Sequence, residues 1–221
     1  MKDFRVLLFF PNETLVGVMP PTLALLAACL KQDGFDVKLF DCSNYKVKNT
    51  LTNDQMREKL GHVKKTEIDQ YIKLKDTDIH EDFVKIVEEW KPNLLAFNLI
   101  DSTIKYSYEF IKKVKHLNIP TIAGGIGSTF NYEMILNSGL FTYACIGEGE
   151  EALVELCNKL LNGEDTTNIK NLAHKNKEGK IVKREDGTVA IDWERKSKNE
   201  KVILGANPKV EVTKKDTKKT G

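Results

Sequence analysis

The chain has 221 residues, enough for one domain with a sizeable core and a smaller appendage but too few for two large domains. Apolar residues make up 41% of it and charged residues 30%, and the net charge of +2 gives no indication of a nucleic-acid or membrane partner. Its N-terminal apolar run is far shorter than the roughly 20 residues of a membrane span, and no small-residue cleavage site follows it. We therefore expect a cytoplasmic protein.

The four cysteines, Cys29, Cys42, Cys145 and Cys157, are scattered along the chain. None stands at C-x-x-C or C-x-x-x-C-x-x-C spacing, which argues against a zinc site or a locally ligated iron–sulfur cluster. We expect reduced and mostly buried thiols.

The first 40 residues read as a strand, a helix and a second strand. Residues 4–10 form a nearly continuous apolar run, residues 22–34 fill most of a helix surface, and residues 35–40 alternate. This order is typical of a parallel sheet. Residues 43–78 are polar and rich in lysine, with weak helical periodicity over 54–74, and we treat them as an insertion.

The regular pattern then resumes. Helical segments at 80–92, 106–117 and 149–163 alternate with apolar strands at 93–100, 120–123 and 143–146. Five strands with intervening helices predict an α/β domain over residues 1–165, with a doubly wound five-stranded parallel sheet. Short alternating runs at 171–175, 180–184 and 188–193 predict a small β meander over 166–195, and residues 196–221 read as a flexible basic tail.

Ligands of an open parallel sheet bind outside the carboxyl ends of its strands, where the strand order reverses. Four loops, residues 11–20, 101–103, 124–129 and 147–150, are predicted to lie at that end. The loop GGIGST at 124–129 combines glycines that admit a bulky ligand with hydroxyls that can bind phosphate or ribose. The same glycines also suit a tight turn without a ligand, and Ser102 and Thr103 also suit a helix cap.

Other ligands of this architecture fit less well. A phosphate-accepting receiver would use Asp101, but Asn12-Glu13 is only half of the acid pair it needs, and its lysine after the fifth strand is missing. A flavodoxin-like or dinucleotide site requires a glycine-rich turn after the first strand, whereas here it follows the fourth.

Taken together, the segments VLLFFPNE, IHEDFVKIVEEWKPNLLAFNLIDST, IPTIAGGIGSTF and ACIGEGEEALVELCNKLLNG resemble the N-terminal cobalamin-binding domain of cobalamin-dependent radical S-adenosylmethionine enzymes. The resemblance covers roughly residues 1–193 and implies a flavodoxin-like, Rossmann-like cobalamin-binding fold. It implies that the glycine loop and the hydroxyls after the third strand hold the nucleotide tail, and that the first loop faces the lower side of the corrin. The implied cofactor-binding residues are Asn12, Glu13, Thr14, Val18, Met19, Ile100, Asp101, Ser102, Thr103, Gly124, Gly125, Gly127, Ser128, Thr129, Gly147, Glu148 and Gly149.

Two features depart from that family. The chain lacks the three-cysteine cluster, so S-adenosylmethionine and an iron–sulfur cluster would belong to a missing catalytic domain or to a partner subunit. It also lacks a D-x-H-x-x-G loop, since Asp78-Ile79-His80 is followed by Phe83 where glycine is needed. We therefore predict cobalamin bound base-off, without a histidine as lower ligand, and we assign no metal-ligating or catalytic residue.

Three functions remain open at this point. The first is a cobalamin-binding module, either a fragment of a radical S-adenosylmethionine methyltransferase-like enzyme or its partner. The second is a degenerate relative that binds no cofactor and acts as an interaction or regulatory protein. The third is a separate enzyme on another ligand, although no nucleophile, base and orienting residue can be assembled. We also expect Gly125→Leu to exclude the ligand with little loss of fold, unless φ is positive there.

Overall fold

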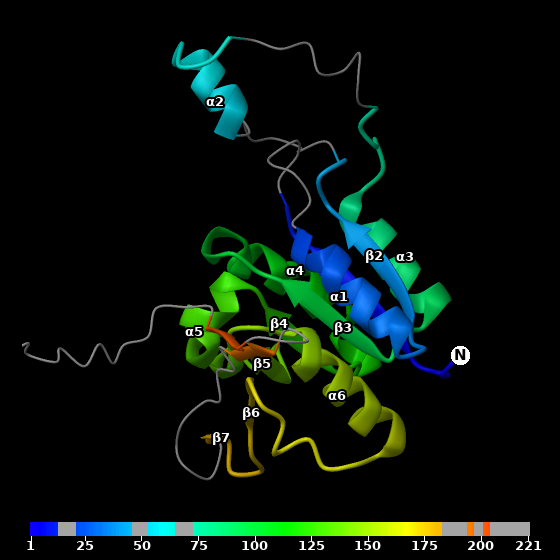
Figure 1. The fold of residues 1–221 in the computed structure, drawn as a ribbon. Coiled ribbons are helices and arrows are strands. Elements are labelled where there is room, and N and C mark those ends of the chain that lie inside the picture. The colour runs from blue at the N-terminus through cyan, green and yellow to red at the C-terminus, as the bar shows by residue number, and fades with distance from the viewer. Residues whose placement is uncertain (13–20, 46–52, 65–72, 183–193, 197–200, 204–221) are drawn as a thin grey trace, which may run out of the picture. The chain divides into compact units, whose positions relative to one another are not determined.

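The computed structural model describes residues 1–12, 21–45, 53–64, 73–182, 194–196 and 201–203. Its main sheet has seven strands in the order β2-β1-β3-β4-β5-β6-β7 (Figure 1). The first five are parallel, namely β1 (Arg5–Phe10), β2 (Asp36–Asp41), β3 (Leu94–Asn98), β4 (Thr121–Gly124) and β5 (Tyr143–Cys145). The predicted doubly wound parallel sheet is thus confirmed, and its strand order reverses between β1 and β3.

Two strands of the expected β meander are described, and they extend this sheet. β6 (Leu172–Lys175) runs antiparallel to β5, and β7 (Ile181–Val182) runs antiparallel to β6. The third expected strand, residues 188–193, lies outside the described residues. Within residues 192–221, β8 (Glu194–Lys196) pairs antiparallel with β9 (Lys201–Ile203), and the remainder of the expected tail, residues 204–221, is also outside the described part.

Helices cover both faces of the sheet. α1 (Pro21–Gln32) and α6 (Glu150–Asn162) lie side by side on one face (Figure 1). α3 (Ile79–Trp90), α4 (Ile104–Val114) and α5 (Ile126–Asn137) pack on the other. Short 3-10 turns, η2 (Asp101–Thr103) and η3 (Lys115–Leu117), flank α4. No helix in the described part of the chain has both the length and the apolar character needed to cross a membrane.

The helix ends follow from local chemistry. The Asp78 carboxylate accepts hydrogen bonds from the backbone N–H groups of His80 and Glu81 and so begins α3, which ends where Lys91 takes a left-handed conformation.

Within the predicted insertion, the structure describes the short helix α2 (Asn53–Lys59). An isolated parallel bridge joins Tyr45, near the beginning of the insertion, to Lys75, near its end.

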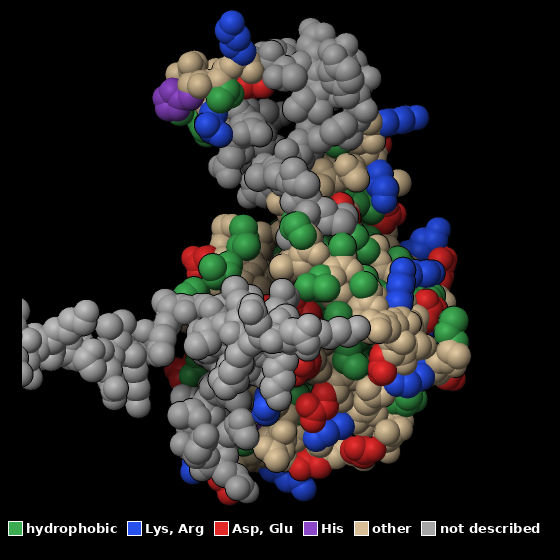
Figure 2. All heavy atoms as spheres, in the orientation of Figure 1, with side chains coloured by type: hydrophobic (Ala, Val, Ile, Leu, Met, Phe, Trp, Pro, Cys, Tyr) green, Lys and Arg blue, Asp and Glu red, His purple; other side chains and the backbone are tan. Residues whose placement is uncertain are grey.

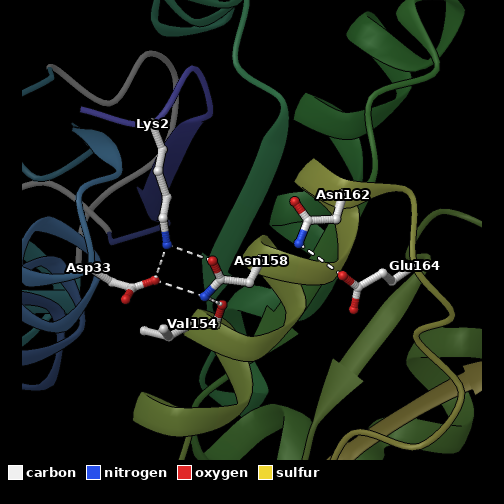
Figure 3. Close-up of polar contacts among 6 residues, drawn as sticks. All are labelled: Lys2, Asp33, Val154, Asn158, Asn162 and Glu164. Atoms are coloured by element: carbon white, nitrogen blue, oxygen red, sulfur yellow. Dashed lines mark hydrogen bonds and ion pairs between the residues drawn. The ribbon is translucent and has the colours of Figure 1, made fainter.

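A cluster of polar side chains joins α1 to α6 at the end where both helices terminate (Figure 3). The Lys2 ammonium donates to Asp33 Oδ2 and to Asn158 Oδ1, each at 2.6 Å, and Asn158 Nδ2 donates to Asp33 Oδ2 at 2.7 Å. We call these three residues the polar clamp. Its two hydrogen bonds to Asp33 lower the pKa of that carboxyl. Three elements distant in sequence are held together here.

Candidate functional site

The face of the sheet that α1 and α6 cover carries small side chains where its central strands end. Leu8, Ala96 and Ile122 lie in register across β1, β3 and β4. Because strand side chains alternate between faces, Asn98 and Gly124 form the next row toward the carboxyl ends. The missing bulk at Ala96 and Gly124 leaves room beneath the two helices.

A cavity of about 110 Å³ fills this room. Its walls are mostly apolar and come from four strands, the two helices and the loop between β5 and α6. The lining residues are Leu8, Thr22, Leu23, Leu26, Ala96, Phe97, Asn98, Ile122, Gly124, Gly125, Cys145, Gly147, Glu148, Gly149, Glu150 and Leu153. It is smaller than the apolar cavity of about 150 Å³ that accepts benzene in another protein, so it is far too small for a corrin.

Most of the polar side chains that line the cavity come from the ends of strands and the beginnings of helices, and we call this part of the lining the mouth. Thr22 and Glu150 stand in the first turns of α1 and α6, Asn98 ends β3, and Glu148 follows β5. Both helices direct their N-terminal N–H groups toward the carboxyl ends of the strands. This arrangement favours anionic groups at α1, whereas Glu150 and Glu151 in the first turn of α6 offset it there. Figure 2 shows acidic side chains gathered over α6 and apolar ones exposed over α1.

Two cavity glycines leave space that a side chain would fill. A Cβ on Gly149 would lie 3.5 Å from Cys145 Sγ and 3.7 Å from Leu26 Cδ2, both ordinary contacts inside the cavity. A Cβ on Gly124 would meet only Phe97 O, at 3.8 Å. These residues thus fit a bound aromatic group, because their missing side chains open the cavity without being required by the backbone.

Gly125 and Gly127 serve the fold. Gly125 has φ of 83° and ψ of −178°, and a Cβ there would collide with Asn98 Oδ1 and lie 2.7 Å from Leu99 O. A Cβ on Gly127 would lie 2.8 Å from the carbonyl carbon of Ile100. The exception attached to the expectation for Gly125→Leu therefore applies, because φ is positive there and this backbone conformation is nearly exclusive to glycine, so the substitution should also cost stability.

The hydroxyls of the same loop bond to the protein itself. Ser128, which is fully buried, donates to Ala123 O and Cys145 O. Thr129 Oγ1 accepts from the Gly147 N–H at 3.0 Å. Both side chains thus hold α5 against the ends of β4 and β5.

The remaining predicted residues that the structure describes do not line the cavity. Thr103 is buried, and its hydroxyl bonds to the backbone of Ile100. Asp101 accepts a hydrogen bond from Asn131, and Ser102 is exposed. Asn12 donates to Ser43 Oγ. The predicted residues Glu13, Thr14, Val18 and Met19 lie outside the described residues.

Sequence reasoning missed much of the cavity. Asn98 was not selected, although a polar residue that ends an apolar strand is a detectable signal. Leu23, Leu26 and Leu153 lie in segments that the sequence predicts as helices, and only the packed structure distinguishes a cavity wall from a filled core. Cys145 also lines the cavity, and burial raises the pKa of its thiol to about 12, so it is neutral near pH 7.

His80 lies on the opposite face from the cavity. Its ring packs on Phe110 of α4, with centroids 4.4 Å apart, and burial lowers its pKa. Within the described ranges, no three histidine, cysteine or carboxylate side chains come together as a metal site.

The family model of the B12 binding domain matches residues 15–157. The chain belongs to the B12-binding domain family. No curated protein matches it. This B12-binding domain is similar in fold to the radical S-adenosylmethionine methyltransferase TsrM from Kitasatospora setae, solved with tryptophan and an S-adenosylmethionine analogue, with a TM-score of 0.62 and 20% identity. It is also similar to the cobalamin-dependent S-adenosylmethionine radical enzyme OxsB with aqua-cobalamin bound, with a TM-score of 0.55 and 14% identity.

These likenesses cover most of this chain but a small part of the larger enzymes. The TsrM match spans 84% of this chain and 30% of TsrM, and the OxsB match spans 81% and 22%. The B12-binding domain thus corresponds to one part of each enzyme.

Proposed function

We propose that this B12-binding domain holds cobalamin base-off, with the nucleotide tail in the cavity between α1 and α6 and no histidine on the lower face of the cobalt. The single observation that carries the proposal is the cavity itself. It lies at the carboxyl ends of the strands beside the point where the strand order reverses, and its mostly apolar lining suits a flat aromatic base.

Individual residues take separate roles in this proposal. Leu23, Leu26 and Leu153 enclose the base, and the Asn98 carboxamide at the mouth is placed to hydrogen-bond to the tail. The N-terminal N–H groups of α1 face the same mouth, and the first turn of α1 contains no acid to offset their attraction for a phosphate.

We propose the absence of a histidine ligand from the sequence of the loop after β1, and the position of His80 supports it. His80, in the first turn of α3, packs on Phe110 of α4, on the face of the sheet that lies away from the cavity. Residues 11–20, the loop after β1, contain no histidine.

When bound, cobalamin supplies a cobalt that can accept and release a methyl group. We infer that the chain carries this cofactor for a radical S-adenosylmethionine methyltransferase-like enzyme, as a fragment of it or as its partner. S-adenosylmethionine and the iron–sulfur cluster would reside in that catalytic part. A cytoplasmic location belongs to this proposal, and four free cysteines accord with it.

The first test fills the cavity. Purified protein is mixed with hydroxocobalamin, desalted and examined for corrin absorbance. We expect the wild type to retain cobalamin and Gly149→Leu to lose at least about tenfold in affinity, because the new side chain occupies the space between Cys145 and Leu26.

The matched control adds the same side chain elsewhere. Ala24→Leu lies on the exposed side of α1, and it should retain cobalamin like the wild type. If the wild type retained no corrin, the proposal would fail and the non-binding, interaction role would gain support. If Gly149→Leu retained as much cobalamin as the wild type, the nucleotide tail would not lie in this cavity.

A second measurement tests the lower ligand. Electron paramagnetic resonance of the bound Co(II) form should show no nitrogen superhyperfine splitting from an axial ligand. Such splitting, if it vanished in His80→Ala, would identify a histidine ligand and contradict the proposal.

A further inference from the structure

We propose that the cavity between α1 and α6 selects corrinoids by the base at the end of their nucleotide tail, accepting benzimidazoles and discriminating against purines. This inference rests on the proposed function and adds to it a choice among cofactors that share one corrin ring.

The inner wall of the cavity offers no polar side chain among the described residues. Leu8, Ile122 and Leu153 are each at most 4% exposed, and Leu23 closes the wall from α1. The strands behind them are parallel and in register, so their backbone N–H and C=O groups are engaged in the sheet.

The one heteroatom among these inner side chains belongs to Cys145. Its thiol is directed to Glu148 O at 3.7 Å, and burial raises its pKa to about 12, which keeps it neutral. A neutral thiol is a weak donor and a weak acceptor, so it cannot satisfy the edge of a polar base. Hydrogen-bonding side chains are thus confined to the mouth, where Asn98 ends β3.

The two classes of base differ in what this lining can satisfy. A dimethylbenzimidazole released from cobalt has one ring nitrogen that needs a donor, and the Asn98 carboxamide can provide it. Its methyl groups suit the leucine and isoleucine walls. An adenine has several ring nitrogens and an exocyclic amino group, and most of these would be buried without partners.

An unsatisfied buried polar group commonly weakens binding by about tenfold or more. We therefore expect the full chain to bind hydroxocobalamin at least about tenfold more tightly than the analogue with adenine in place of dimethylbenzimidazole. Cobinamide, which has the same corrin and no tail base, should also bind more weakly than hydroxocobalamin. Dissociation constants from isothermal titration calorimetry measure all three.

A variant changes the lining with little change in shape. Cys145→Ser places a hydroxyl, a stronger donor and acceptor, on the inner wall. It should bring the dissociation constants of hydroxocobalamin and its adenine analogue closer together. Cys157→Ser is the control, because Cys157 is equally buried on α6 but does not line the cavity. It should leave the ratio unchanged.

The outcomes separate this inference from the proposed function. If none of the three corrinoids binds, the proposed function itself fails. If both complete corrinoids bind equally well, cobalamin binding stands and the selectivity is overturned. If cobinamide matches hydroxocobalamin, or Cys145→Ser leaves the ratio unchanged, the base does not contact this wall and the inference is likewise wrong.

Discussion

The two faces of the sheet are built from different side chains. Beneath α3 and α4, Phe9 contacts four other phenylalanine rings, with centroids 4.5–5.6 Å apart. Beneath α1 and α6, the corresponding positions of the central strands hold Ala96 and Gly124, and a cavity remains. One face is filled with aromatic rings, and the other keeps space for a ligand.

This difference separates stability from binding within one sheet. A filled aromatic cluster contributes dispersion and apolar burial that no ligand needs to complete. The face beneath α1 and α6 lacks part of that contribution where its strands end. The polar clamp holds these two helices together at their opposite ends. Substitutions on the two faces should therefore have separable effects.

The largest effect is expected in the aromatic cluster. Phe9→Ala should lower the free energy of unfolding by about 3–5 kcal/mol, because Phe9 is fully buried and its neighbours cannot close the gap. Urea denaturation measures the loss. Leu25→Ala, on the exposed side of α1, should change stability by less than about 0.5 kcal/mol. Cobalamin affinity of the folded fraction should remain near that of wild type, and a selective loss of affinity would contradict the separation.

Substitutions at the adjacent glycines Gly124 and Gly125 test the separation of stability from binding more directly. Gly125→Ala should cost at least about 1–3 kcal/mol in stability, because φ is 83° and the Leu99 carbonyl occupies the space of a side chain. Gly124→Ala should fold normally and weaken cobalamin binding, since its Cβ meets only Phe97 O. Thermal unfolding and corrin titration distinguish the two. A stable Gly125→Ala protein would refute the assigned backbone role.

A smaller effect is expected from His174 on β6. Its side chain is 8% exposed, and burial lowers its pKa, an effect that Asp165 partly opposes. The unfolded chain takes up a proton near the ordinary pKa of 6.5 while the folded chain stays neutral, so stability is full above that pH and falls as the pH drops. The slope from one histidine is at most about 1.4 kcal/mol per pH unit.

Urea denaturation at several pH values between 5.5 and 7.5 tests this expectation. His174→Gln should flatten the dependence, and His80, whose pKa is also lowered, should leave a residual slope. An unchanged slope in His174→Gln would mean that this histidine titrates alike in both states.

The sequence predicted the parallel strands well because each is a short apolar run with clear boundaries. It missed α5, since the segment IGSTFNYEMILN lacks an apolar stripe at helical spacing and is fixed by Gly125, Ser128 and Thr129 against the strand ends. It predicted β6 as part of a meander but not its pairing with β5, because short alternating runs do not reveal which sheet edge they pair with. The role of Asn98 and the existence of the cavity could not be predicted, because both depend on which faces of elements distant in sequence pack together.

The smallest expected effect concerns the polar clamp, at the opposite end of α1 and α6 from the cavity. Lys2 and Asp33 are about one third exposed, so their ion pair is screened, and Lys2→Met should cost only roughly 0.5–1 kcal/mol. Because the folded-state pKa of Asp33 is lowered, this contribution is full above its ordinary pKa of 3.8 and is lost as the pH falls through the folded value.

Urea denaturation of Lys2→Met at pH 7 and pH 3 measures that contribution, which should shrink at the lower pH. Lys85→Met is the matched control, since its ion pair with Glu89 is 4.0 Å long and about two thirds exposed, and it should be neutral. Neither variant should change cobalamin affinity, because the mouth of the cavity is formed by the first turns of the two helices and the clamp by their last. A marked loss of affinity in Lys2→Met alone would show that the clamp sets the spacing of α1 and α6 along their whole length, and the two ends would then have to be treated as one unit.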